Sequence, residues 1–401
     1  MQRLIFKDMK KILLALLVFS CFGCFAQVES AYEKYVREQN EKMQQMKKNQ
    51  DEGIAKLQKE YEDYVKKEQE AYNKFLKERE QQWGKGNVKE STQNDWVEYS
   101  KDGKTRSDVN FESGKVTIEI IQEPGKPVDK KEIENKLKFL LTNKGKTKDY
   151  DSEVEKAVPL QDKPVLENQV KTPSGELVTE KTIDKDVKEI AESIKPEVKT
   201  IKGDDNVQRE VVTIKFELVP DHIRTRAEQY KNEVEKYCQK WKVDPALAYA
   251  IMQTESSFNP KAKSYVPAYG LMQIVPRTAG ADCAQSLKKP FSAPTGNYLY
   301  EPENNIEMGV HYLYLLQKRY YSNVTNKDNQ TLCVIASYNT GAGNVAKALR
   351  GDTKIGKAIP QINEMSYSQL FKYFEKHLMP ETQNYIRKVT ERMNNFKTWL
   401  K

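Results

Sequence analysis

The sequence has few of the residues that build metal sites or disulfide frameworks. Among 401 residues there are only 3 histidines and 5 cysteines. The histidines are scattered and lack the paired spacing of metal ligands; they are His222, His311 and His377. We therefore expect no metal and no cofactor.

Two of the cysteines lie near the N-terminus, which leaves Cys238, Cys283 and Cys333 in the rest of the chain. An odd number of cysteines defines no disulfide framework. The sequence is compatible both with one disulfide formed in an oxidising compartment and with buried thiols.

Long apolar runs are also missing. The one strongly apolar stretch, Ile12 to Phe22, is 11 residues long, whereas a spanning helix needs roughly 20. This excludes a protein that crosses a membrane several times. Basic residues precede the stretch and small residues follow it, which is the layout of a secretory signal over residues 1–26.

Two processing routes compete at the end of this signal. The segment Cys21-Phe22-Gly23-Cys24 resembles a bacterial lipoprotein box, which favours a lipid on Cys24 over one on Cys21. Ordinary cleavage after Ala26 is the alternative. Either route exports the chain to the periplasm, and a lipid gives a membrane anchor without a spanning helix; an outer-membrane lipoprotein is compatible with this pattern.

The charge is unevenly distributed. The chain has 66 Lys and Arg against 58 Asp and Glu, and residues 223–401 hold 25 of the basic and 15 of the acidic residues. The remainder, 41 against 43, is nearly balanced. The excess positive charge belongs to the C-terminal part. It suits an anionic partner by raising encounter rates.

Composition divides the exported chain into three parts. Residues 27–90 are rich in Glu, Lys and Gln and predict a helical segment over 28–83. Its narrow apolar face, which includes Tyr64, Ala71 and Phe75, is available to a partner helix or a neighbouring domain, and a solvated stalk or hairpin is favoured over a specific coiled coil.

Residues 91–222 predict a small α+β accessory domain with a structural or docking role. Alternating β-branched residues indicate antiparallel strands at 96–99, 116–121 and 211–218. Helices are expected near 130–141 and 187–194, and 143–176 reads as loop.

Residues 223–401 predict an all-helical domain with functional loops. Helices are expected at 225–240, 245–255, 305–321, 332–337, 344–350 and 380–400. Asp244 before Pro245 is a good N-cap, and Asn304 or Asn305 is expected to cap the long helix.

Glu255 is the candidate catalytic residue. It follows Ile251 by one helical turn, on the face that Leu247 and Ala250 make apolar. A carboxyl half covered by apolar neighbours can stay protonated near neutral pH, as a general acid for an ether oxygen requires. Taken alone, a glutamate at the end of a helix more often has no catalytic role.

Three further motifs follow Glu255 in order. They are GLMQ at 270–273, YN-x-G-x-G from Tyr338, and E-T-x-x-Y from Glu381. Amides form hydrogen bonds with sugar hydroxyl and acetamido groups, and tyrosine rings cover the apolar face of a pyranose. Together with ES-x-F-N-P at Glu255, they indicate a sugar-binding site.

Residues 240–400 resemble, through these four motifs, the catalytic domain of soluble-type lytic murein transglycosylases, which are related in fold to goose-type lysozyme. The signal sequence, the α+β part and the closing residues Asn395-Phe396 and Trp399-Leu400 are most similar to a membrane-bound branch of that family. The resemblance implies an α+β multidomain protein in which a lysozyme-like all-α catalytic domain follows a small α+β domain and a helical segment.

The resemblance also implies roles for individual residues. Glu255 would be the sole catalytic acid–base, and the sugar would be bound by Ser264, Gln273, Tyr338, Asn339, Glu381 and Tyr385. Glu381 would hold the wall of the site rather than act as a second catalytic carboxylate. With one carboxylate, the expected reaction cleaves the MurNAc–GlcNAc β-1,4 bond of peptidoglycan and leaves 1,6-anhydromuramyl ends, since hydrolysing glycosidases use two.

Two alternatives stay open. One is a lysozyme-like muramidase that hydrolyses the same bond, and the other is a noncatalytic murein-binding scaffold lipoprotein. The expected partner in each case is the peptidoglycan glycan strand; cell-wall protein partners stay unknown. The basic charge alone would also allow nucleic acid, but export and the lack of a nucleic-acid module argue against it.

Overall fold

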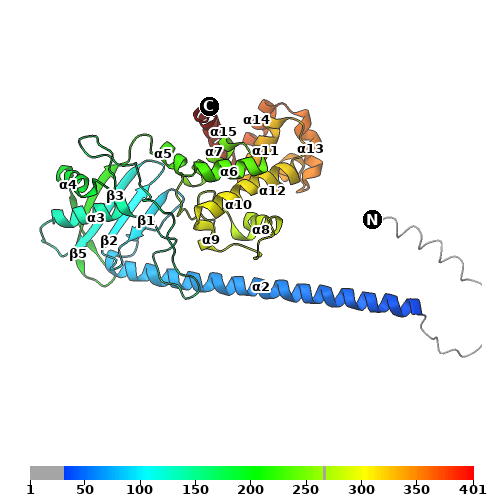
Figure 1. Cartoon of the computed structure of the whole chain (residues 1–401), viewed down its shortest axis with the longest axis horizontal. Coiled ribbons are helices and arrows are strands. Elements are labelled where there is room, and N and C mark those ends of the chain that lie inside the picture. Colours follow the sequence, from blue (N-terminus) through cyan, green and yellow to red (C-terminus); the bar gives the residue numbers. More distant parts are fainter. Residues whose placement is uncertain (1–30, 265–267) are drawn as a thin grey trace, which may run out of the picture. The chain divides into compact units, whose positions relative to one another are not determined.

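The computed structural model describes residues 31–264 and 268–401 (Figure 1). The expected signal at 1–26, with Cys21, Cys24 and the cleavage site after Ala26, lies outside these residues. Within the described ranges, no helix combines the length and apolar character needed to cross a bilayer. The chain divides into two units, with the boundary between Asp63 and Tyr64.

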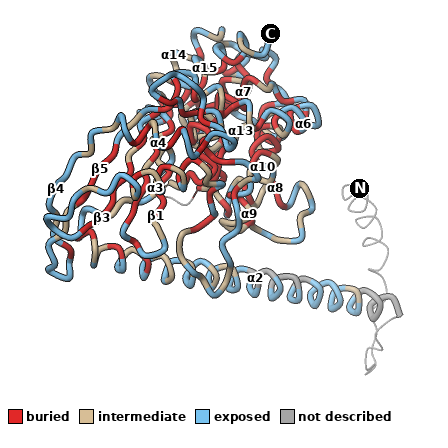
Figure 2. The backbone as a smooth tube through the Cα atoms, turned by 60° about the vertical axis from the view of Figure 1, so that its left-hand side comes forward, coloured by how far each residue is buried: buried red, intermediate tan, exposed pale blue. Residues whose placement is uncertain are grey.

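Of the helix expected at 28–83, the described part forms α2 (Ala31–Trp83), which runs through the boundary of the two units. In the first unit, exposed ion pairs four residues apart line it, including Lys48–Glu52 and Lys56–Glu60, each at 3.9 Å. Such pairs stabilise a solvated helix by a few tenths of a kcal/mol each. Most of its described surface is exposed (Figure 2).

The second unit begins with the last turns of α2 and contains a five-stranded antiparallel sheet of order β1-β2-β3-β5-β4. The strands are β1 (Asp95–Tyr99), β2 (Thr105–Asn110), β3 (Lys115–Gln122), β4 (Glu197–Lys202) and β5 (Gln208–Glu217). The sequence predicted β1, β3 and β5. It missed β2 and β4 because β2 has one aliphatic residue and β4 is an exposed edge strand with a charged residue at three of its six positions.

Alternating strand residues face two different layers. One face packs on α3 (Lys130–Thr142) and α4 (Ile183–Ser193), with Trp96, Ile118 and Ile214 in its core. The other face receives Phe75 and Trp83 from the end of α2. The apolar face of α2 in this unit therefore packs on the sheet. Below, "sheet region" means residues 84–219, which hold β1 to β5, α3, α4 and their connections.

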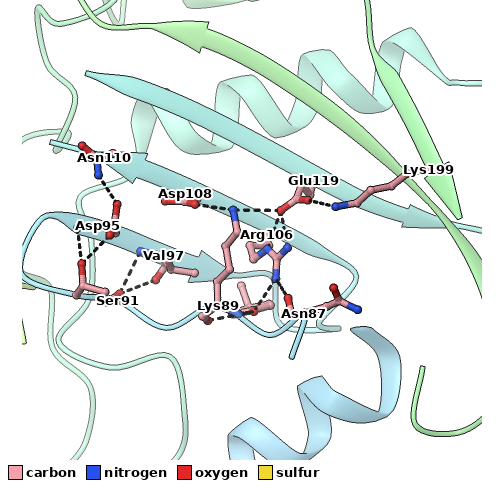
Figure 3. Close-up of polar contacts among 12 residues, drawn as sticks. Asn87, Lys89, Ser91, Asp95, Val97, Arg106, Asp108, Asn110, Glu119 and Lys199 are labelled. Carbon is pink, nitrogen blue, oxygen red and sulfur yellow. Dashed lines mark hydrogen bonds and ion pairs between the residues drawn. The ribbon is translucent and has the colours of Figure 1, made fainter. Parts of the chain in front are cut away.

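A charged cluster lies on the sheet and includes Lys89, Arg106, Glu119 and Lys199 (Figure 3). Buried Arg106 donates from Nε to Glu119 at 2.9 Å, and its guanidinium lies 4.1 Å from the Trp83 ring centroid. Burial alone would raise the pKa of Glu119, but the charge and hydrogen bonds of Arg106 outweigh it and the pKa falls below its usual value. Lys89 and Lys199 complete the cluster.

The rest of the unit, called the helical region, contains helices α5 to α15 between residues 222 and 399 around one apolar core (Figures 1 and 2). Two expected helices are each divided in two. The helix expected at 225–240 is divided into α5 (His222–Gln229) and α6 (Lys231–Trp241). The helix expected at 305–321 is divided into α10 (Pro302–Leu315) and the π-helix η2 (Leu316–Tyr320). Helices α7 (Pro245–Ser256), α11 (Lys327–Thr340), α12 (Ala342–Arg350) and α15 (Pro380–Trp399) lie where expected, with α11 longer.

Five elements of the helical region were not expected. They are η1 (Pro276–Gly280), α8 (Ala281–Ser286), α9 (Gly296–Tyr300), α13 (Ile355–Glu364) and α14 (Tyr367–His377). The first three have only five or six residues each, too short for an amphipathic period to be recognised.

The cap predictions had opposite outcomes. Asp244 caps α7, since its Oδ1 accepts from the backbone N–H of Ala246 at 2.9 Å. The prediction that Asn304 or Asn305 caps the long helix was wrong, because α10 begins at Pro302 after Glu301. Asn305 is instead buried inside the helix, where its amide binds a neighbouring loop.

Cys238, Cys283 and Cys333 are all buried free thiols. Burial raises the pKa of Cys238 to about 12, so this thiol stays protonated and unreactive near neutral pH. Of the two arrangements compatible with the sequence, the structure has the buried thiols.

Candidate active site

Glu255, the candidate acid, lies near the C-terminal end of the buried helix α7. Residues Ala246 to Met252 are all buried, and a helix apolar on every side belongs at the centre of a domain. The helix ends at Ser256. Its C-cap, Ser257, has a left-handed φ of +49°, and Phe258 follows with a φ of +62°. Glu255 lies in the last turn and is half-buried.

Tyr385 of α15 holds the carboxyl of Glu255. Its hydroxyl donates to Glu255 Oε1 at 2.5 Å. Burial raises the pKa of Glu255 to about 7, although the hydrogen bond from Tyr385 acts in the opposite direction and the negative charge of Glu381 adds to the rise. A carboxyl with this pKa is present in both protonation states near neutrality, as a group that first donates and then accepts a proton requires.

The GLMQ loop packs against this end of α7. Ser256 Oγ, adjacent to Glu255, donates to the Leu271 carbonyl at 2.7 Å. Asn305 accepts from the Met272 N–H at 2.7 Å and donates to the carbonyls of Tyr269 and Leu299, both at 2.7 Å. A side chain in α10 thereby fixes the loop beside the acid.

Glycine is required at position 270. Its φ is +75°, and a Cβ there would lie 2.4 Å from both Asn305 Nδ2 and the Leu299 carbonyl oxygen. The first residue of the motif thus permits the close approach of the loop to α10.

Gln273 has a left-handed backbone, with φ of +47°. Its Nε2 donates to the carbonyls of Ala262 and Gly270, both at 2.9 Å. Its buried Oε1 has no hydrogen-bond partner among the described residues. The amide closes the loop on itself and leaves one acceptor for a donor from outside.

Tyr338 and Asn339 stand at the end of α11 and join the loop to α15. Tyr338 Oη donates to the Met272 carbonyl at 2.8 Å, and the pKa of Tyr338 is raised by burial and then by the charge of Glu255. Asn339 Oδ1 accepts from Thr382 Oγ1 at 2.7 Å. Helices α7, α11 and α15 and the GLMQ loop therefore meet around one carboxyl.

Two predicted residues lie at the margin of this group. Ser264 is half-buried, and its Oγ accepts from the Ala268 N–H at 3.1 Å across a loop whose residues 265–267 are not described. Glu381 is exposed in the first turn of α15 and acts on Glu255 through its charge.

Sequence reasoning missed Arg392. It follows Tyr385 by two helical turns on α15, and its Nη1 donates to the Gln253 carbonyl at 2.9 Å. The signal was available, because residues seven apart lie on one helix face. Asn305 was singled out but assigned the wrong role.

The site contains the Glu255 carboxyl with its pKa near neutrality, the Tyr385 hydroxyl that donates to it, and several side-chain amides. In the part of the chain that the structure describes, no group of three or more His, Cys, Asp or Glu is placed to hold a metal ion. The chemistry that these groups can perform is proton transfer beside a bound polar ligand.

Two family models match the chain. Residues 232–359 match the transglycosylase SLT domain, and residues 46–229 match the N-terminal domain of membrane-bound lytic murein transglycosylase C. The second match covers the part of the chain for which no motif was found, and it agrees with the membrane-bound branch indicated by the architecture.

Curated relatives match most of the chain. A membrane-bound lytic murein transglycosylase C of Haemophilus influenzae (strain PittEE) is 32% identical over 316 residues, covering 79% of this chain and 85% of the relative. The protein of the same name from Sodalis glossinidius is 32% identical over 318 residues, with coverages of 79% and 86%.

A solved structure also matches. It is the 70 kDa soluble lytic transglycosylase of Escherichia coli, at 25% identity and a TM-score of 0.35, and the match covers 45% of this chain but only 26% of that one.

Proposed function

Because the chain belongs to the membrane-bound lytic murein transglycosylase C family, we propose that it cleaves the β-1,4 bond between MurNAc and GlcNAc in peptidoglycan and forms 1,6-anhydromuramyl ends. The observation that carries the proposal is the half-buried Glu255, with its pKa raised by burial to about 7 and its Oε1 bound by Tyr385 at 2.5 Å.

The first step needs Glu255 protonated. Its proton passes to the glycosidic oxygen as the bond from MurNAc C1 to that oxygen breaks, and the carbonyl oxygen of the MurNAc 2-acetamido group bonds to C1. Tyr385 then donates to a carboxylate, and a charge-assisted hydrogen bond is stronger than a neutral one. The contact at 2.5 Å thus favours the state that follows proton release.

The second step returns the proton. The Glu255 carboxylate takes it from the C6 hydroxyl, O6 bonds to C1, and the acetamido oxygen leaves. The product is an anhydro ring, no water is consumed, and Glu255 is again protonated. One carboxyl performs both transfers, so no partner carboxylate is required.

Sugar binding is assigned to the polar groups around Glu255. We propose that the partnerless Oε1 of Gln273 accepts from the glycan, and that Tyr338, Asn339, Ser264 and Tyr385 line the muramyl site. The basic excess of residues 223–401, 25 against 15, suits a substrate that carries stem-peptide carboxylates.

The relatives are named as membrane-bound. We propose that this chain is anchored on the periplasmic side by a lipid on Cys24. Labelling of cells with a lipid precursor tests this: the label persists in Cys21→Ala and disappears in Cys24→Ala, whereas cleavage after Ala26 leaves both unlabelled.

Incubation of the full chain with purified murein tests the reaction. Mass spectrometry is expected to find muropeptides one water lighter than those of lysozyme, and Glu255→Gln is expected to bind murein without releasing them. Products with reducing ends would establish the hydrolase instead. Binding without products in the unaltered chain would establish the noncatalytic scaffold.

A further inference from the structure

We propose that Arg226 is a positioning residue for the acid, which makes the sheet region part of the catalytic apparatus rather than a spacer. This inference rests on the proposed role of Glu255. Arg226 connects the end of α7 to the sheet region.

Arg226 is almost completely buried in α5 and is satisfied by neutral groups. Its Nε donates to the Ser257 carbonyl at 3.1 Å, two residues beyond Glu255. Its Nη1 donates to Gln169 Oε1 at 2.7 Å, and its Nη2 donates to the Phe111 carbonyl at 2.6 Å. One guanidinium therefore connects the C-cap of α7 to two segments of the sheet region.

The burial of this cation is costly. Desolvation lowers the pKa of Arg226 to about 9. Its guanidinium contacts two backbone carbonyls, an amide oxygen and the Phe111 ring, whose centroid is 4.5 Å away, and all of these groups are neutral. A buried guanidinium contributes little net stability in such surroundings compared with apolar packing. Its planar fork does fix the relative position of three acceptors, which an apolar side chain cannot do.

Further bonds connect the same turn to the sheet region. Asn259 Nδ2 lies 3.3 to 3.4 Å from the carbonyls of Thr92, Gln93 and Asp95, and Ser257 Oγ donates to Asn94 Oδ1 at 3.2 Å. Buried Lys261 pairs with Asp149 at 2.7 Å. The left-handed turn at 257–258 is thus bonded to the sheet region at several points, while Phe258 packs in the core of the helical region.

The position of this turn sets the environment of Glu255. If the turn relaxes, the last turn of α7 gains water and the Glu255 carboxyl shifts against Tyr385. Added hydration lowers a carboxyl pKa that burial has raised. Displacement of a reacting group by about 1 Å can cost about 100-fold in rate. The loss is expected in kcat, because the groups assigned to sugar binding are not bonded to Arg226.

The test compares Arg226→Met and Arg226→Lys with the unaltered full chain. Initial rates of muropeptide release are measured against murein concentration and pH. Arg226→Met is expected to lower kcat by about 10- to 100-fold, to leave the apparent KM within about twofold, and to move the alkaline limb of the kcat profile to lower pH. Arg226→Lys, which retains a charge and donors, is expected to recover part of both effects.

Arg106→Met is the matched control. Arg106 is likewise a buried arginine over an aromatic ring, but its partners are Glu119, Asn87 and Tyr99, and none belongs to the helical region (Figure 3). This variant is expected to melt at a lower temperature while keeping kcat and the alkaline limb. If Arg226→Met does not fold, Gln169→Met removes one acceptor of Arg226 and carries the same expectation on a smaller scale.

The proposal is overturned if Arg226→Met, or Gln169→Met where the first does not fold, keeps an unchanged kcat and alkaline limb. It is also overturned if the Arg226 variant changes only the apparent KM, or if Arg106→Met loses as much kcat. These results are distinct from failure of the proposed function, in which the unaltered chain itself releases no anhydromuropeptides.

Discussion

Replacing Tyr385 by Phe isolates the hydrogen bond that opposes burial at the catalytic carboxyl. Tyr385 Oη donates to Glu255 Oε1 at 2.5 Å and lowers the Glu255 pKa, whereas burial raises it to about 7. Phe retains the buried ring. A hydrogen bond to a charged group contributes about 1.5 to 3 kcal/mol, and each pKa unit corresponds to about 1.4 kcal/mol.

The pKa of Glu255 is therefore expected to rise by about one to two units in Tyr385→Phe. The acid must be protonated for the first step, so the alkaline limb of the kcat profile moves to higher pH by the same amount. On the acidic side of that limb, a weaker acid donates more slowly, and kcat is expected to fall.

The assay is the initial rate of muropeptide release at saturating murein between pH 5 and 10. Tyr373→Phe serves as the control, because the Tyr373 hydroxyl donates to the Ala348 carbonyl at 3.0 Å and not to Glu255. Its profile is expected to match that of the unaltered chain. An alkaline limb that stays in place or moves to lower pH in Tyr385→Phe would refute the assignment of this limb to Glu255.

Three further predictions concern stability and charge. Burial raises the folded pKa of Glu255 from 4.5 to about 7, so its ionisation destabilises the fold as pH rises through this window. The free energy of unfolding of Glu255→Gln is expected to exceed that of the unaltered chain by about 1 to 3 kcal/mol at pH 8 and to equal it at pH 4; equal urea midpoints at pH 8 would contradict this. Gly270→Ala is expected to lower the free energy of unfolding by more than about 2 kcal/mol, because its Cβ would meet Asn305. Gly343 lies inside α12, and a Cβ there would have its nearest neighbour at 3.6 Å. Gly343→Ala is therefore expected to be neutral or stabilising in the same unfolding measurement. Glu381→Gln removes a negative charge that raises the Glu255 pKa, so the alkaline limb of the kcat profile is expected to move slightly to lower pH. The products are expected to keep their anhydro ends. A loss of several orders of magnitude in kcat would instead identify Glu381 as a second catalytic carboxylate.

The sequence predicted those parts of the fold whose signals are local. Asp244 and Pro245 followed by an apolar run indicated α7, including its cap, because both signals depend on neighbours within a few residues. Strand β4 could not be found, since an exposed edge strand needs no apolar alternation. Its place depends on pairing with β5.

The candidate site was predictable as a set of residues but not as a geometry. The motifs placed Glu255, Gln273 and Tyr385 in one list, but no spacing showed that the Tyr385 hydroxyl contacts the carboxyl. The position of Asn305 at the start of the expected helix suggested a cap, whereas tertiary contacts with the GLMQ loop determine its role. Arg226 gave no signal, because its acceptors include a backbone carbonyl 115 positions away.

The bonds around the left-handed turn at 257–258 also bear on how an active molecule forms. Asn259 and Lys261 bind partners 166 and 112 positions earlier in the chain, and closing loops of that length is slow compared with forming the local contacts of a helix. During refolding, helical content is therefore expected to return before murein cleavage. With the proposed role of Arg226, a chain whose sheet region has not yet folded lacks full lytic capacity.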